Sequence, residues 1–202
     1  VEKGRLVFPS GGFSMNDEAT TYYDDIIENM ITGHRFLLDE FGYIPTVGWH
    51  IDPFGHSAAQ AYLFSLMGFN MFFIERINYQ EFEQKKLSRD LEVIWQPKGF
   101  PEEEYILTHI NYFKYGGTRD IGYCMPSNMC MMGDRMKSLS KLASWITGQA
   151  DHFRTNQILF QIGNDFSFSY EGKELYKAIE ELRNELNSHE KFQINEIGRA
   201  HV

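Results

Sequence analysis

The feature that most constrains the fold of this 202-residue chain is an alternation of short apolar runs with longer amphipathic stretches that stop at glycine. The short runs, which we expect to be strands, are 5–8, 46–51, 70–74, 92–95, 105–108, 157–162 and 191–194. The amphipathic stretches, which we expect to be helices, are 16–41, 57–67, 137–154 and 171–187. This repetition predicts an α/β fold with a parallel sheet, either open or closed into a barrel. Residues 116–133 interrupt it as a long irregular excursion.

Composition excludes several classes of function. The net charge is −9 and the pI is about 5.2, which argues against nucleic acid or an anionic membrane surface as the main partner. Two cysteines are too few for a disulfide scaffold or a cysteine-rich zinc module. The apolar runs are much shorter than the roughly 18 residues of a membrane span. We therefore expect no nucleic-acid partner and no membrane-spanning segment.

Local signals predict where two of the helices begin and end. Asn16 is a candidate N-cap, and Asp17 and Glu18 would then suit the positive end of the helix dipole. Gly42 would end this first helix, and Gly68 would end the next one.

Two acidic residues follow predicted strands. Asp52 comes directly after one apolar run and Asp165 comes shortly after another, and each is near an aromatic residue, Phe54 or Phe166. Active sites of parallel α/β proteins lie beyond the carboxyl ends of the strands. Two carboxylates at one such edge suit glycoside hydrolysis, in which one attacks and the other protonates the leaving oxygen. The alternative is that both are ordinary helix caps or turn residues.

A possible metal site lies in the same segment. His50 and Asp52 are two apart, so both would point to one side of a strand, and His56 follows four residues later. The alternative is that these histidines are exposed or bonded to the backbone.

The run 48–57, Gly-Trp-His-Ile-Asp-Pro-Phe-Gly-His-Ser, closely resembles the nucleophile motif of the family 38 glycoside hydrolases, the α-mannosidases. Further segments resemble the family in the same order, and the similarity extends over residues 1–196. These segments are 11–19, 33–37, 68–79, 93–95, 153–156 and 163–166. Within the family the chain is most similar to the lysosomal-type enzymes.

The resemblance implies a retaining, zinc-dependent α-mannosidase whose catalytic domain is a parallel seven-stranded β/α barrel, incomplete in this chain. Asp52 matches the nucleophile, which is also a zinc ligand in the family. Asp165 matches the general acid/base, with Asn164 beside it where Golgi-type enzymes carry a second aspartate. The substrate is expected to be an α-mannoside or an N-glycan, and the compartment a lysosome or another acidic or secretory one.

The resemblance also implies substrate-binding residues. Phe54 and Arg76 match residues near the substrate, and Tyr115 matches a substrate-contacting tyrosine, with Tyr112 as the competing assignment. Phe13 stands where the family usually has tryptophan.

We expect residues 1–196 to be part of a catalytic domain and residues 197–202 to be a non-native tail, because their sequence matches the translation of a sequencing adapter. The family's other zinc ligands would lie outside this chain, so the chain alone should bind zinc poorly and hydrolyse little. Homo-oligomerisation stays open. Two other functions compete: a non-catalytic carbohydrate-binding descendant of the fold, and a different zinc hydrolase, such as a deacetylase, that uses His50, Asp52 and His56.

Overall fold

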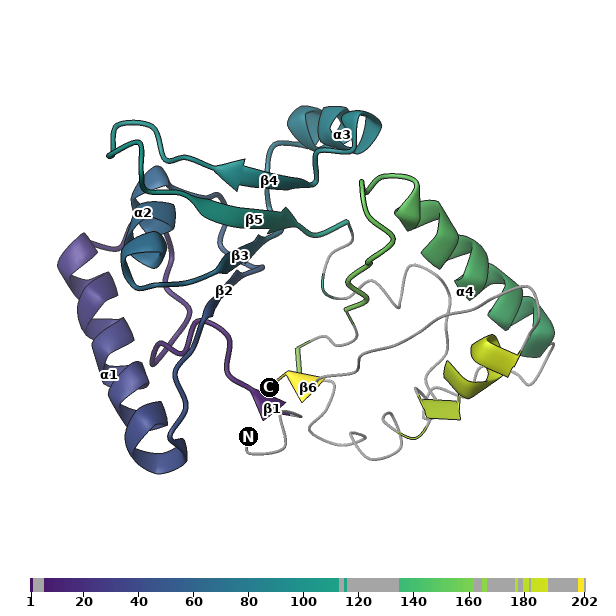
Figure 1. Cartoon of the computed structure of the whole chain (residues 1–202), viewed down its shortest axis with the longest axis horizontal. Coiled ribbons are helices and arrows are strands. Elements are labelled where there is room, and N and C mark those ends of the chain that lie inside the picture. The colour runs from purple at the N-terminus through teal and green to yellow at the C-terminus, as the bar shows by residue number, and fades with distance from the viewer. Residues whose placement is uncertain are drawn as a thin grey trace. The chain divides into compact units, whose positions relative to one another are not determined.

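Figure 1 shows the chain as a computed structural model. The structure describes residues 1, 6–112, 115, 135–161, 165–166, 177, 180–181, 183–188 and 200–201. The chain divides into two compact units, Val1–Tyr112 with Gly198–Val202, and Phe113–Ile197. Each unit is described by itself.

A four-stranded sheet forms the centre of the first unit (Figure 1). Its strands, in spatial order, are β2 (Val47–His50), β3 (Met71–Ile74), β5 (Ile106–Ile110) and β4 (Glu92–Trp95). The first three are parallel, and His50, Ile74 and Ile110 stand in register, so these strands end level with one another. A separate parallel pair joins β1 (Leu6–Val7) to β6 (Ala200–His201). The prediction of an α/β fold with a largely parallel sheet is confirmed.

The exception is β4, which runs antiparallel to β5. The connection between them, residues 96–105, contains no helix or strand. It is shorter than the dozen or more residues that a parallel crossover usually needs, whereas an antiparallel return needs only a loop. The expectation of a wholly parallel sheet is therefore wrong at this strand.

In the first unit the helices are α1 (Tyr23–Phe41), α2 (Ala58–Leu66) and α3 (Tyr79–Ser88). The second unit contains α4 (Arg135–Ala150). The predicted boundaries of α2 are confirmed, because Ser57 caps it by accepting a hydrogen bond from the Gln60 N–H, and Gly68 follows its end with φ of +78°. Within the described ranges, no helix combines the length and the apolarity needed to cross a membrane.

The predicted start of α1 at Asn16 is wrong. The helix begins at Tyr23, and Tyr22 occupies the N-cap position without a side-chain hydrogen bond. Asp17 instead closes a turn by accepting hydrogen bonds from the backbone of Ala19 and Thr20, both at 2.8 Å. The predicted end of α1 is correct, since Gly42 adopts φ of +60° there.

The sequence analysis did not predict α3, because this helix has no apolar stripe and buries none of its residues. Asn78 caps it by accepting from the Gln80 and Glu81 amides at 2.9 and 3.2 Å. A Lys86–Glu83 ion pair at 2.8 Å adds a contact along the helix.

The core of the first unit forms where α2 packs on the sheet. A Cβ atom at Gly48 in β2 would lie 2.6 Å from the Phe64 ring of α2, so only glycine lets this ring approach the strand. Phe64 and Phe72 are both fully buried, and their ring centroids lie 5.0 Å apart. His50, on the same face of β2, is 1% exposed.

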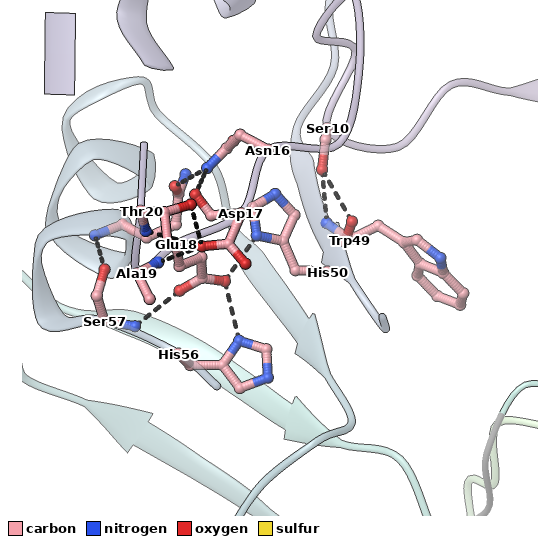
Figure 2. A network of polar contacts seen from close by, with 11 residues as sticks. Ser10, Asn16, Asp17, Glu18, Ala19, Thr20, Trp49, His50, His56 and Ser57 are labelled. Carbon is pink, nitrogen blue, oxygen red and sulfur yellow. Dashed lines mark hydrogen bonds and ion pairs between the residues drawn. The ribbon is translucent and has the colours of Figure 1, made fainter. Parts of the chain in front are cut away.

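Ser10 occupies the free edge of β2. Its N–H donates to the Val47 carbonyl at 2.6 Å, and its Oγ accepts from the Trp49 N–H at 2.7 Å (Figure 2). Ser10 thereby makes hydrogen bonds that a neighbouring strand would otherwise make.

Three expectations concern residues 116–194. Residues 157–161, the described part of one predicted strand, adopt no strand, because an apolar run becomes a strand only where another strand pairs with it. The predicted excursion at 116–133 and the predicted strand at 191–194 lie outside the described residues.

Gly33 lies where α1 packs against the loop that follows Ser10, and a substitution there tests this packing. A Cβ at this position would lie 2.5 Å from the Gly12 carbonyl carbon and 2.7 Å from the Phe13 nitrogen, both backbone atoms. We expect Gly33→Ala to lower the free energy of unfolding by about 3 kcal/mol, because the backbone must move to admit the methyl group. Urea denaturation measures this change.

The matched control is Gly148→Ala in α4, where an added Cβ meets no atom of the described residues within 4 Å. Helix propensity should make that variant neutral or more stable by up to about 1 kcal/mol. Equal effects of the two substitutions would contradict the proposed close packing.

Candidate functional site

The level ends of β2, β3 and β5 bring polar residues to one edge of the sheet. Asp52 follows β2, Arg76 follows β3 and Asn111 follows β5. This is the edge where parallel α/β proteins place their active sites. The candidate site therefore lies at the carboxyl ends of these three strands.

Asp52 and Arg76 form the charged centre of this edge. The Nε of Arg76 donates to Oδ1 of Asp52 at 3.0 Å, and Nη2 donates to the same oxygen. The side chain of Asp52 is 48% exposed and that of Arg76 is 28% exposed. Among the described residues no hydrogen bond reaches Oδ2 of Asp52, and the side chain that carries it is half exposed.

Phe54 completes this group. The guanidinium carbon of Arg76 lies 4.8 Å from the centroid of the Phe54 ring, a cation–π contact. The ring is 81% exposed, so it presents apolar surface to solvent beside a carboxylate. The structure thus brings together three of the residues singled out from the sequence, Asp52, Phe54 and Arg76.

Asn111 forms a second polar pair with Glu75, the residue that precedes Arg76 in the sequence. Nδ2 of Asn111 donates to Oε2 of Glu75 at 3.3 Å, and both residues are buried. This pair links the residue that precedes Arg76 to the end of β5.

A buried carboxylate, Glu18, lies beside the loop that carries Asp52 (Figure 2). Its Oε1 contacts Nδ1 of His50 at 2.6 Å and Nδ1 of His56 at 2.9 Å, and its Oε2 accepts from the Ser57 N–H at 2.7 Å. The side chains of Glu18 and His50 are 1% exposed and that of His56 is 5% exposed. Glu18 was expected in the first turn of a helix, and its role here was not predicted. No local signal could have revealed it, because the histidines lie 32 and 38 positions away.

Opposing influences act on the pKa of Glu18. Burial, the largest of them, raises it, but the hydrogen bonds from His50 and His56 and the charge interactions with these rings together hold the pKa below its ordinary value. The carboxylate is therefore stabilised in its ionised form.

The zinc cluster predicted from His50, Asp52 and His56 is not formed. Both histidines face Glu18, while Asp52 turns to Arg76. The strand ends at His50, so the alternation that would point His50 and Asp52 the same way does not extend to Asp52. In the described ranges no three histidine, cysteine or acidic side chains are grouped so as to hold a metal ion.

Asp165 and Tyr115 lie together in the second unit. The Tyr115 hydroxyl donates to Oδ1 of Asp165 at 3.5 Å, a long hydrogen bond, and both Asp165 and Phe166 are exposed. Tyr112, the competing assignment for the substrate-contacting tyrosine, belongs to the first unit and contacts Phe82 of α3. Asn164 lies outside the described residues.

The carboxylate, arginine and aromatic ring lie beyond the carboxyl ends of parallel strands, where α/β proteins bind their ligands. Nearly the whole chain also matches one family. Residues 1–200 match the glycosyl hydrolases family 38 N-terminal domain, and the chain belongs to this family.

Alpha-mannosidases from several distant organisms are similar to this chain in sequence. The chain is 36% identical over 202 residues to a lysosomal alpha-mannosidase of Dictyostelium discoideum, and 34% identical over 197 residues to an alpha-mannosidase of Canavalia ensiformis. These alignments cover 96% and 93% of the chain and 20% of each relative. A human lysosomal alpha-mannosidase is 35% identical over 188 residues, which cover 83% of the chain and 18% of the relative. The chain thus spans about a fifth of the length of these relatives.

A solved structure shares the fold. The chain aligns to an alpha-mannosidase from Enterococcus faecalis V583 with a TM-score of 0.55 and 15% sequence identity, covering 76% of this chain and 16% of that one. The resemblance to α-mannosidases stated from the motifs is confirmed.

The lowered pKa of Glu18 predicts how stability depends on pH. A carboxylate whose pKa is lowered by folding contributes stability that is complete above its ordinary value, 4.5, and is lost as the pH falls through the lowered value. Glu18→Gln has no such group. We expect this variant to be less stable than wild type by about 3 kcal/mol near neutrality.

The difference should shrink as the pH falls from about 5 toward about 3, because wild type alone loses the ionised carboxylate. Thermal denaturation of both proteins across this range measures the difference. A difference that stays constant, or widens in acid, would show that Glu18 is not stabilised as a carboxylate.

Proposed function

We propose that the complete protein containing this chain hydrolyses terminal α-mannosidic bonds with retention of configuration, assisted by zinc. The observation that carries the proposal is the meeting of Asp52, Arg76 and Phe54 at the carboxyl ends of β2 and β3. Membership of the α-mannosidase family supports mannosides as the substrate class.

Asp52 is proposed as the nucleophile. Arg76 holds one of its oxygens, and the other accepts no hydrogen bond from the described residues, which leaves it to attack the anomeric carbon of a bound sugar. The fixed guanidinium also limits rotation of the carboxylate, which lowers the entropic cost of reaching the attacking geometry. The exposed ring of Phe54 offers apolar contact to the C–H groups of the sugar.

Asp165 is proposed as the general acid/base, and Tyr115 as a substrate-binding residue. The acid must first donate a proton to the leaving oxygen and then accept one from water. The Tyr115 hydroxyl beside Asp165 can orient this carboxyl group.

Zinc fits the residues only in part. The Oδ2 oxygen of Asp52 is a suitable ligand, but no group of three ligands exists in the described residues, so a zinc ion would need ligands from elsewhere in the protein. When bound, zinc would supply Lewis acidity and fixed contacts to sugar hydroxyls. We propose that Asp52 is this chain's ligand, and that the chain alone binds zinc poorly and hydrolyses little.

The remaining family features are also proposals. The parallel strands β2, β3 and β5 would be part of a seven-stranded β/α barrel, and residues 1–196 would belong to the catalytic domain. Lysosomal relatives support a lysosomal or secretory location with an acidic interior.

Asp52→Asn tests the nucleophile. In the complete protein, release of mannose from an aryl α-mannoside at acidic pH should fall by about a thousandfold or more, because an amide oxygen is a poor nucleophile. The matched control is Asp39→Asn, which makes the same exchange at an exposed position of α1 and should leave the rate unchanged.

Normal rates for both variants would show that Asp52 is not the nucleophile. An intact wild-type protein that binds mannose but releases none would favour the non-catalytic carbohydrate-binding alternative.

Chelation tests the metal. Treatment of the complete protein with 1,10-phenanthroline should remove activity, and added Zn²⁺ should restore it, while the non-chelating 1,7 isomer should have no effect. Zinc content is measured on the same samples. Full activity in a protein stripped of zinc would contradict the role of the metal.

A further inference from the structure

We propose that Glu18 is a positioning residue for Asp52: its buried carboxylate ties together the two ends of the loop that carries the nucleophile. This inference rests on the proposed function, since it assigns to Asp52 the role argued above. The three partners of Glu18 are His50, His56 and Ser57, which stand on both sides of Asp52 in the sequence.

The contacts of Glu18 close the base of this loop. Oε1 is shared by the ring that precedes Asp52 and the ring that follows it, at 2.6 and 2.9 Å. Oε2 binds the Ser57 amide, which belongs to the N-cap of α2. Residues 51–55 between these anchors contain no regular hydrogen-bonded structure. Their path is therefore determined by where the two ends are held.

The proton arrangement follows from the charge of Glu18. An ionised carboxylate only accepts hydrogen bonds, so both imidazoles carry a proton on Nδ1. Three donors then converge on one side chain that is 1% exposed. Water cannot readily replace any of them at such a buried site, which makes the arrangement rigid.

Glu18 is itself held on both sides in the sequence. Nδ2 of Asn16 donates to Oε1 of Gln60 in α2 at 2.9 Å, and this contact is buried. The Asp17 turn through Ala19 and Thr20 fixes the backbone on the other side (Figure 2). These contacts hold the segment 16–20, and with it the Glu18 carboxylate, in a fixed position beside α2.

Arg76 and Glu18 position Asp52 in different ways. Arg76 contacts the Asp52 side chain directly, whereas Glu18 contacts residues that precede and follow Asp52 in the loop. Loss of Glu18 should therefore leave the Asp52–Arg76 pair possible but misplaced.

A purely structural role is the competing explanation. A buried carboxylate with two histidines could stabilise the first unit without affecting catalysis. That role predicts less folded protein but a normal rate for each folded molecule. The positioning role predicts a lower kcat in folded protein, with KM nearly unchanged.

The first variant is Glu18→Gln in the complete protein. Glutamine keeps one acceptor oxygen but replaces the other with an NH2 group that only donates, so the amide cannot accept from all three N–H groups as the carboxylate does. The matched control is Glu104→Gln, the same exchange at the opposite end of β5, where Glu104 accepts from the Ser65 hydroxyl at 3.0 Å. The control should keep wild-type kcat.

We expect kcat of folded Glu18→Gln to fall by roughly a hundredfold, because a displacement of about 1 Å has an effect of this size. KM should stay within about threefold. Hydrogen exchange of peptides covering residues 50–57 should be faster than in the control. A folded Glu18→Gln protein with wild-type kcat would overturn the inference.

A second pair of variants decides the question if Glu18→Gln does not fold. His56→Ala removes one donor to Oε1, while His56→Asn offers an amide N–H in its place. A lower kcat in the alanine variant, largely recovered in the asparagine variant, supports the inference. Equal wild-type rates in both overturn it.

These experiments distinguish failure of the proposed function from failure of the inference about Glu18. If the wild-type protein released no mannose, that function would fail, and hydrogen exchange alone would test the loop. Faster exchange of residues 50–57 in Glu18→Gln than in Glu104→Gln would still support the inference that Glu18 holds this loop, and equal exchange would overturn it.

Discussion

Backbone hydrogen bonds between parallel strands hold His50, Ile74 and Ile110 level, and the candidate site depends on this register. A shift of one residue between β2 and β3 would turn the side chains of one strand to the opposite face. It would also move Asp52 relative to Arg76 by about 3.3 Å along the strand, more than a hydrogen bond can span. The packing of Phe64 against Gly48 and Phe72 reinforces this register, because the ring fits only where the strand carries no side chain.

The edge of the sheet combines two electrostatic environments that serve different purposes. Asp52 forms an ion pair with Arg76, and because its side chain is half exposed it remains accessible to other molecules. Glu18 is almost fully enclosed, and its charge faces the His50 and His56 rings and the Ser57 N–H. Exposed ion pairs contribute little to stability, whereas breaking a buried one costs several kcal/mol, on the order of 3–5. The exposed carboxylate is thus accessible to a ligand, whereas the buried one holds the surrounding chain in place.

Local sequence signals predicted the parts of the fold that local physics decides. The strands β2 to β5 and the helix α2 lie within a residue or two of their predicted positions, because apolar runs, Ser57 and Gly68 act over short distances. The start of α1 was wrong since Asn16 and Glu18 have partners far along the chain, which outweigh their capping tendency. The helix α3 was missed because its cap and ion pairs, rather than an apolar stripe, define it. Residues alone suggested Asp52 and the neighbouring aromatic Phe54, while Arg76 came only from the family resemblance.

The serine at the edge of β2 has a consequence for how this protein associates with itself. An edge strand exposes unpaired backbone groups that can recruit a strand from another molecule. Ser10 occupies two of these groups on β2, so this side of the four-stranded sheet resists such recruitment. Within the part of the chain that the structure describes, the opposite side ends in β4, where Ile94 is 62% exposed and stands opposite Leu107, itself 37% exposed. Of these two edges, intermolecular strand exchange and the aggregation that follows from it would therefore begin at β4 rather than at the edge that Ser10 covers.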